Sequence, residues 1–157
     1  MLPVHKALYL RVRVPAMGSL SALRRRWREL PEPALEAMAG TFDGEFVGPR
    51  PLRAAFSGGL GLFGMRGWHG KRFDTASKGI NRLKSGTGFP MYARIEPSYD
   101  DGRNAIVATY GDHERPPFRW IRDEFRELDE DTLLGPSFVD APGLRRVGTP
   151  FLLRRTG

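Results

Sequence analysis

The feature that most constrains the fold is a glycine–aromatic–glycine segment, Gly40-Thr41-Phe42-Asp43-Gly44, which comes directly after a helix-like stretch. A second segment, Trp68-His69-Gly70-Lys71-Arg72-Phe73, again places aromatic side chains beside a glycine. A helix followed by a glycine-flanked aromatic strand is a common beginning of small antiparallel barrels, and such barrels often enclose a pocket. The order of these elements therefore predicts a small β-barrel.

The stretch before the first motif is typical of an amphipathic helix. Ser19 or Ser21 can cap it. Its apolar residues recur at steps of three and four, so they lie on one stripe with the arginines opposite. Pro31 and Pro33 end it. We expect this N-terminal α-helix, with the short turn that follows it, to plug one end of the barrel.

From residue 40 onward the chain is typical of short strands separated by turn residues. Asp100-Asp101-Gly102 lies between two alternating runs and predicts a hairpin turn. The polar, glycine-rich residues 75–88 are expected to form a connector that acts as a lid over the barrel mouth. The predicted strands are 40–47, 52–56, 60–68, 71–74, 91–97, 104–110, 118–128, 132–139 and 150–155.

The chain divides into a short preface and one domain. In residues 1–18, alternating apolar residues end at Pro15, and Met17-Gly18-Ser19 resembles a second start. This N-terminal extension is either an edge strand or an upstream addition. Residues 19–157 are predicted to form the barrel domain, because no linker or internal repeat interrupts them.

Composition sets limits on the function. With 157 residues and 40% hydrophobic content, the chain can bury one core. It has no cysteine, which excludes disulfides, thiolate metal sites and cysteine nucleophiles and fits a cytoplasmic protein. No apolar run reaches the roughly 18 residues of a transmembrane helix. The net charge is +7, with one dense basic run, Arg24-Arg25-Arg26 with Arg28. We favour a solvated basic surface over nucleic-acid binding, because neither stacking aromatics nor a helix-turn-helix accompanies this run.

These motifs resemble the calycin superfamily of lipocalin-like barrels and, within it, a bacterial family named for a Gly-x-Trp-x-Gly motif. The first segment corresponds to that motif, and Trp68 to Phe73 matches the Trp-x-Gly-Lys-x-Phe segment that follows it in the family. Residues 122–126 and 132–135 look like the family's C-terminal half. Phe42 replaces the defining tryptophan, so the indole N–H is missing. The resemblance covers about residues 20–155 and implies a mainly β fold, a single lipocalin-like barrel, that binds a ligand.

The densest candidate site is the second motif. Strand alternation places Trp68, Gly70 and Arg72 on one face and His69, Lys71 and Phe73 on the other. Gly70 leaves room for a ligand or another backbone to approach closely. Lys71 or Arg72 at a cavity mouth would hold a carboxylate or phosphate. The alternative, which we give equal weight, is that Trp68 fills the barrel core and that Lys71 and Arg72 are solvated.

Two later strands mix polar and apolar residues. In residues 91–96 the polar face carries Tyr92 and Arg94, and an outward orientation is favoured because alternation usually means hydrophobic-in. In residues 118–128 neither face is purely apolar. A lumen lined by Trp120, Arg122 and Glu124 would suit an amphipathic ligand. Over this lumen lining we slightly favour an arrangement in which the charged residues of this strand form cross-strand ion pairs on the outside of the barrel.

Catalytic signatures are absent from the sequence. The three histidines have no metal-site spacing, and there is no nucleophile elbow, phosphate loop or dinucleotide fingerprint. No metal, no cofactor and no catalytic residue is therefore predicted, and enzymatic activity stays open.

The predicted function is the binding of a hydrophobic or amphipathic small molecule in a barrel cavity. A solid, side-chain-filled interior would contradict it. The alternatives are an isomerase, cyclase or hydrolase acting on a hydrophobic substrate in that cavity, and a nucleic-acid or anionic-surface binder that uses the arginine-rich helix. The candidate ligand-binding residues are Phe42, Phe46, Trp68, His69, Lys71, Arg72, Tyr92, Arg94, Tyr110, Trp120, Arg122 and Glu124.

Overall fold

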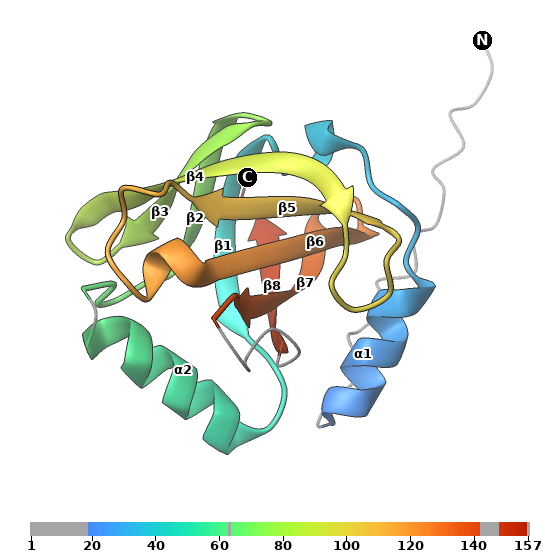
Figure 1. Cartoon of the computed structure of the whole chain (residues 1–157), viewed down its shortest axis with the longest axis horizontal. Coiled ribbons are helices and arrows are strands. Elements are labelled where there is room, and N and C mark those ends of the chain that lie inside the picture. The colour runs from blue at the N-terminus through green and yellow to red at the C-terminus, as the bar shows by residue number, and fades with distance from the viewer. Residues whose placement is uncertain (1–18, 63, 142–147, 157) are drawn as a thin grey trace, which may run out of the picture.

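The computed structural model, which describes residues 19–62, 64–141 and 148–156, is a closed antiparallel barrel (Figure 1). Its strands pair in chain order, and the last strand pairs with the first. They are β1 (Gly40–Phe46), β2 (Gly70–Thr75), β3 (Lys78–Leu83), β4 (Gly86–Pro97), β5 (Asn104–Tyr110), β6 (Ile121–Asp129), β7 (Thr132–Val139) and β8 (Gly148–Arg155). The predicted mainly β barrel with an N-terminal helix is confirmed. The preface, residues 1–18, lies outside the described residues.

Helix α1 (Leu20–Glu29) begins at Ser19, whose hydroxyl accepts a hydrogen bond from the Ala22 amide at 3.2 Å. The helix lies against the outside of the barrel wall, where Leu23 packs with Leu134 and Leu152 of β7 and β8. The end of the barrel is closed instead by the 3-10 turn η1 (Leu35–Met38), because Met38 joins the lumen core. The expected plug is therefore the turn and not the helix.

Two predicted strands, 52–56 and 60–68, are wrong. Helix α2 (Arg50–Leu62) occupies most of this stretch, between β1 and β2, with Pro51 in its first turn, where proline is well tolerated. Short apolar runs interrupted by glycine do not distinguish a strand from a helix by periodicity alone.

The expected lid at residues 75–88 is also wrong, because these residues form β3 and the start of β4. The glycines in these strands allow neighbouring side chains to pack closely against the backbone. A Cβ on Gly79 would lie 2.5 Å from the Phe73 ring, so the glycine makes space for an aromatic side chain of the core. A glycine-rich sequence thus belongs to paired strands here and not to a loop.

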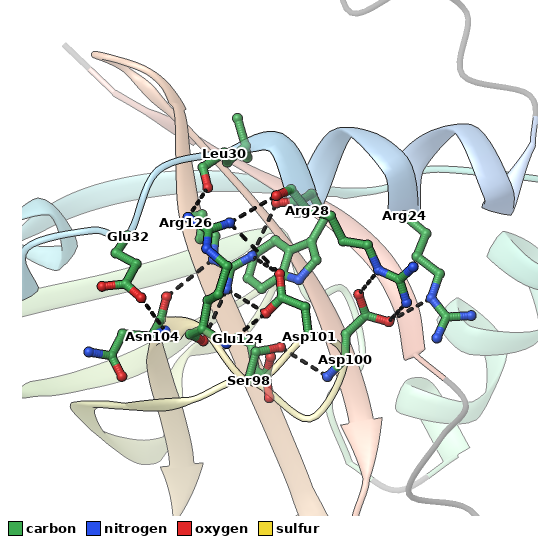
Figure 2. A network of polar contacts seen from close by, with 12 residues as sticks. Arg24, Arg28, Leu30, Glu32, Ser98, Asp100, Asp101, Asn104, Glu124 and Arg126 are labelled. Carbon is green, nitrogen blue, oxygen red and sulfur yellow. Dashed lines mark hydrogen bonds and ion pairs between the residues drawn. The ribbon is translucent and has the colours of Figure 1, made fainter.

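A buried arginine fastens α1 to the barrel (Figure 2). Arg126, on the outward face of β6, has no exposed surface. Both Nη atoms donate to the Asp101 carboxylate, at 2.7 and 2.8 Å, and the guanidinium also donates to the carbonyls of Trp27, Arg103 and Asn104. It stacks on the Trp27 ring with a separation of 4.3 Å. All five donors of the guanidinium are therefore satisfied.

Charged side chains next to Arg126 also hold α1 against the barrel. Asp100 accepts hydrogen bonds from Arg24 and Arg28 of α1, and Arg103 donates to the carbonyls of Arg28 and Leu30 (Figure 2). Burial acts to raise the pKa of Asp101, but hydrogen bonds from Arg126 and from the Arg103 amide bring this pKa below its usual value. Half of the basic run is therefore engaged in holding the helix.

The glycines of the two motifs permit close contacts. The Trp68 ring lies over Gly44, since a Cβ there would be 2.3 Å from the ring. A Cβ on Gly70 would be only 1.9 Å from the Phe42 carbonyl oxygen. The sequence predicted that either a ligand or another backbone approaches Gly70. In the structure it is the backbone of β1.

Substituting Gly70→Ala is expected to lower the free energy of unfolding by about 1–3 kcal/mol, because β1 and β2 must separate to admit the methyl group. Gly58→Ala in α2 is the matched control. Nothing lies within 4 Å of its added Cβ, so that variant should gain about 0.5–1 kcal/mol from helix propensity. Urea denaturation of both variants tests the prediction. Equal stabilities would contradict it.

Candidate functional site

Five polar side chains meet inside the barrel. Lys71 comes from β2, Asn81 from β3, Tyr110 from β5, Asp123 from β6 and Ser137 from β7. All five are buried. Strand alternation directs them inward, because their strand neighbours at two-residue steps, such as Phe73 and Phe125, belong to the lumen core. We call these five residues the lumen cluster.

Lys71 is at the centre of the lumen cluster. Its Nζ lies 3.1 Å from Asp123 Oδ2 and donates to Asn81 Oδ1 at 2.8 Å and to Met91 Sδ at 3.1 Å. The Ser137 hydroxyl donates to Asp123 Oδ1 at 2.7 Å. The lysine and the aspartate thus neutralise each other, and both carboxylate oxygens have a partner.

Burial shifts the protonation equilibria of two members. It lowers the pKa of Lys71, although the nearby Asp123 carboxylate opposes this shift. It raises the pKa of Tyr110 well above the usual value, and the negative charge of Asp123 adds to the rise. The phenol therefore keeps its proton throughout the ordinary pH range, and it can act as a hydrogen-bond donor.

Aromatic rings form the wall beside the lumen cluster. The ring centroids of Phe46 and Trp68 are 5.1 Å apart. The Phe151 centroid lies 6.4 Å from that of Phe46 and 6.3 Å from that of Trp68. The Trp68 indole N–H donates to Asn81 Oδ1 at 3.0 Å, which joins the wall to the polar groups. The free space between them is about 20 Å³, enough for one water molecule. The lumen is therefore mostly filled by side chains, which argues against a ready-made cavity, so ligand binding would need the lumen to open.

The cover over this space combines helix α2, much of which is exposed, with the buried Met65. Leu60, from the last turn of α2, and Met65 line its outer side, and α2 lies along the lower end of the barrel in Figure 1. Much of the helix is exposed; Leu62 is 85% accessible. No atom lies within 4 Å of a Cβ added at Gly58, Gly59 or Gly61. The described side chains of α2 make few apolar contacts, so we expect local opening of this helix to cost little.

Five of the predicted site residues lie inside the barrel. Phe46, Trp68, Lys71 and Tyr110 line the free space, and Phe42 is buried in the lumen core nearer the η1 end. Arg155 covers the Phe42 ring at 4.8 Å and donates to the carbonyls of Ala37 in η1 and of Ala39 directly after it. Phe42 therefore packs in the core although it lacks the indole N–H of the motif tryptophan.

The other seven predicted residues lie outside the lumen. Tyr92 and Trp120 are 49% and 36% exposed. The side chains of the remaining exposed members bond outside the lumen: His69 with the Gly67 carbonyl, Arg72 with Asp74, and Arg94 with Glu96 and with the Thr109 hydroxyl of β5. Arg122 and Glu124 are buried and paired with each other at 3.0 Å, on the outward face of β6. The exterior orientation favoured for Tyr92, Arg94, Arg122 and Glu124 matches this placement, whereas Asp123 of the same strand faces the lumen.

Sequence reasoning missed three members of the lumen cluster: Asn81, Asp123 and Ser137. Asn81 falls in the segment expected to be a connector, so its inward position was hidden. Asp123 lies on the same strand face as Ile121 and Phe125, and these apolar neighbours were the sequence signal that its carboxylate points inward. Ser137 carries no comparable signal.

A second concavity lies outside the barrel. It is a groove of about 250 Å³ between α1 and the outer faces of β7 and β8, walled by apolar side chains such as Leu20, Trp27 and Phe138, with Arg24 and Asp100 also lining it. It offers more space than the lumen, but the described residues that line it include no cluster of buried ionisable groups. The lumen cluster is therefore the stronger candidate for a specific site.

Two further findings concern the described part of the chain. None of its helices is both long and apolar enough to cross a membrane. No group of three His, Cys, Asp or Glu side chains among residues 19–62, 64–141 and 148–156 is arranged to hold a metal ion.

Comparison with known proteins supports the fold. One similar solved structure is described as the crystal structure of a protein from Thermomonospora curvata; it is 23% identical, 88% of each chain is covered, and the TM-score is 0.62. At this identity the likeness concerns the barrel alone. No family model matches the chain, and no curated protein matches it.

Proposed function

We propose that the barrel binds a hydrophobic or amphipathic small molecule in its lumen, at the end covered by α2. The observation that carries this proposal is the buried lumen cluster beside the aromatic wall of Phe46, Trp68 and Phe151. An apolar pocket with a few convergent polar groups is the usual form of a small-molecule site.

The cost of the lumen cluster supports a functional role. Burying an ion pair such as Lys71–Asp123 gains little net stability, and apolar replacements of the same shape are often neutral or better. A barrel that needed only a solid core would fill this position with apolar side chains. Polar groups kept at such a cost are typical of a site that orients a ligand.

The small free volume determines how a ligand would enter. Drug-sized pockets are about 300–1,000 Å³, whereas the closed lumen offers about 20 Å³. Binding therefore requires Leu60, Met65 and the Trp68 ring to move away from the mouth. Of these three groups only Leu60 belongs to α2. Moving Met65 and the Trp68 ring also costs the core contacts of Met65 and the indole hydrogen bond to Asn81, and aromatic contacts with the ligand would have to compensate for this cost.

The test is a fluorescence titration with N-phenyl-1-naphthylamine, a neutral apolar dye. We expect saturable binding by the native protein. Leu60→Trp should fill the mouth and weaken binding at least about tenfold, whereas Leu20→Trp, which fills the outer groove at a position 44% exposed, should leave the affinity unchanged. Absence of dye binding, or loss of binding only in Leu20→Trp, would reject the lumen as the site.

Catalysis in the same lumen is the second candidate, and one observation favours it. Lys71, Asp123 and Tyr110 supply acid and base groups at the free space, with shifted pKa values for the lysine and the phenol. His69 and Glu124 do not line this space and are not part of this set. Turnover of a bound compound that is lost in Asp123→Asn would establish an enzyme.

A further inference from the structure

The hydrogen-bond pattern of the lumen cluster leaves one donor unused. Asn81 Oδ1 accepts from two obligate donors, the Trp68 indole N–H and the Lys71 ammonium. The amide orientation is therefore fixed, and Nδ2 must donate: one bond goes to the Phe89 carbonyl and the other to the Tyr110 hydroxyl oxygen, both at 2.9 Å. The Tyr110 oxygen is thus an acceptor in this network.

The Tyr110 proton has no acceptor in the described part of the chain. The hydroxyl is bonded only to Asn81, and the ring packs against Phe118. The residue is 6% exposed and lines the free space. A buried donor without a partner is costly, so the site favours an acceptor, which is either the one water molecule that the free space can hold or a ligand oxygen that displaces it. The bond from Asn81, which is itself polarised by Lys71, strengthens the phenol as a donor.

The charges of the lumen define the kind of acceptor. Lys71 and Asp123 already neutralise each other, so a carboxylate or phosphate would be buried beside the Asp123 carboxylate without an unpaired cation. A cationic ligand would meet the Lys71 ammonium in the same way. Either charge would be desolvated without compensation. The acidic head group considered from the sequence is therefore disfavoured, and a neutral oxygen is favoured.

We infer that the ligand is a neutral molecule with a carbonyl group on an aromatic or conjugated body, and that Tyr110 donates a hydrogen bond to the carbonyl oxygen. The planar body would pack against the rings of Phe46, Trp68 and Phe151, where stacked and edge contacts are available. This inference rests on the proposed function, because it names the ligand class of the same lumen.

The test uses two probes of nearly equal shape, 2-acetylnaphthalene and 2-ethylnaphthalene, which differ by the carbonyl oxygen. Their affinities are measured by displacement of N-phenyl-1-naphthylamine. The native protein should prefer the acetyl probe about three- to tenfold. Tyr110→Phe should abolish this preference by weakening the acetyl probe alone, and it should fold, because Asn81 Nδ2 keeps the Phe89 carbonyl.

Tyr92→Phe is the matched control, since Tyr92 is half exposed on the outside of β4, and it should behave as the native protein. A second readout is the infrared carbonyl stretch of the acetyl probe, which should lie at lower frequency in the native complex than in the Tyr110→Phe complex. Equal affinities of the two probes for the native protein, or equal weakening of both by Tyr110→Phe, would overturn the inference and leave lumen binding standing. If neither probe nor the dye binds, the proposed function itself fails.

Discussion

Replacing Arg126 with methionine is expected to lower the free energy of unfolding by about 3–5 kcal/mol. The substitution removes all five hydrogen bonds of the guanidinium. It leaves the Asp101 carboxylate without its bidentate partner and exposes the Trp27 face on which the guanidinium stacks. Total stabilities of domains are about 5–15 kcal/mol, so this single change should remove a large part of the stability.

Urea denaturation followed by tryptophan fluorescence measures this effect. Arg154→Met is the matched control, because Arg154 forms an exposed pair with Glu45 at 2.8 Å, and such surface pairs contribute about 0–1 kcal/mol. Arg126→Lys should recover only part of the loss, since an ammonium cannot reproduce the planar fork. Similar stabilities of Arg126→Met and Arg154→Met would show that the buried network does not hold α1.

The second large effect is expected for the lumen ion pair. Lys71→Met or Asp123→Leu alone should lower the free energy of unfolding by about 3–5 kcal/mol, because each leaves an uncompensated buried charge. The double variant Lys71→Met/Asp123→Leu should be much more stable than the sum of the two losses predicts. The coupling arises because the second substitution removes the buried charge that the first substitution left without a partner.

A double-mutant cycle in urea provides the coupling energy. The pH dependence gives an independent check, since Tyr110 and Asp123 are the ionisable groups that face Lys71. The pKa of Lys71 is lowered by burial, so the unfolded chain binds its proton more tightly. The lysine therefore contributes increasing stability as the pH rises toward the usual value of 10.5. This contribution should vanish in Lys71→Met, and strictly additive losses in the cycle would contradict the pairing.

The barrel could be predicted because its signals are local. Residues 104–110 and 132–139 match β5 and β7, and the Asp100-Asp101-Gly102 turn joins β4 to β5. Turn chemistry and alternation act over a few residues, so a single sequence contains them. The helix at residues 50–62 was missed because its glycines and short apolar runs suit both helix and strand.

The lumen cluster was harder to predict because β6 is buried on both faces. Its inward face carries Asp123. Its outward face carries Glu124, which accepts from the Tyr99 amide, and Arg126, which lies under α1. Alternation separates inside from outside only where one face meets water. Once a helix covers the outer wall, charged residues are buried on both sides, and only the three-dimensional pairing distinguishes the lumen from the helix interface.

The most direct test of ligand binding in the lumen is carbon-13 methyl NMR of the methionines during titration with 2-acetylnaphthalene. Met65 and Met91 flank the lumen cluster, whereas Met38 lies in η1 at the other end of the barrel. We predict saturable shifts of the Met65 and Met91 methyl signals, caused by the aromatic ring of the probe, with little change at Met38. Unchanged Met65 and Met91 signals at saturating probe would contradict binding in the lumen.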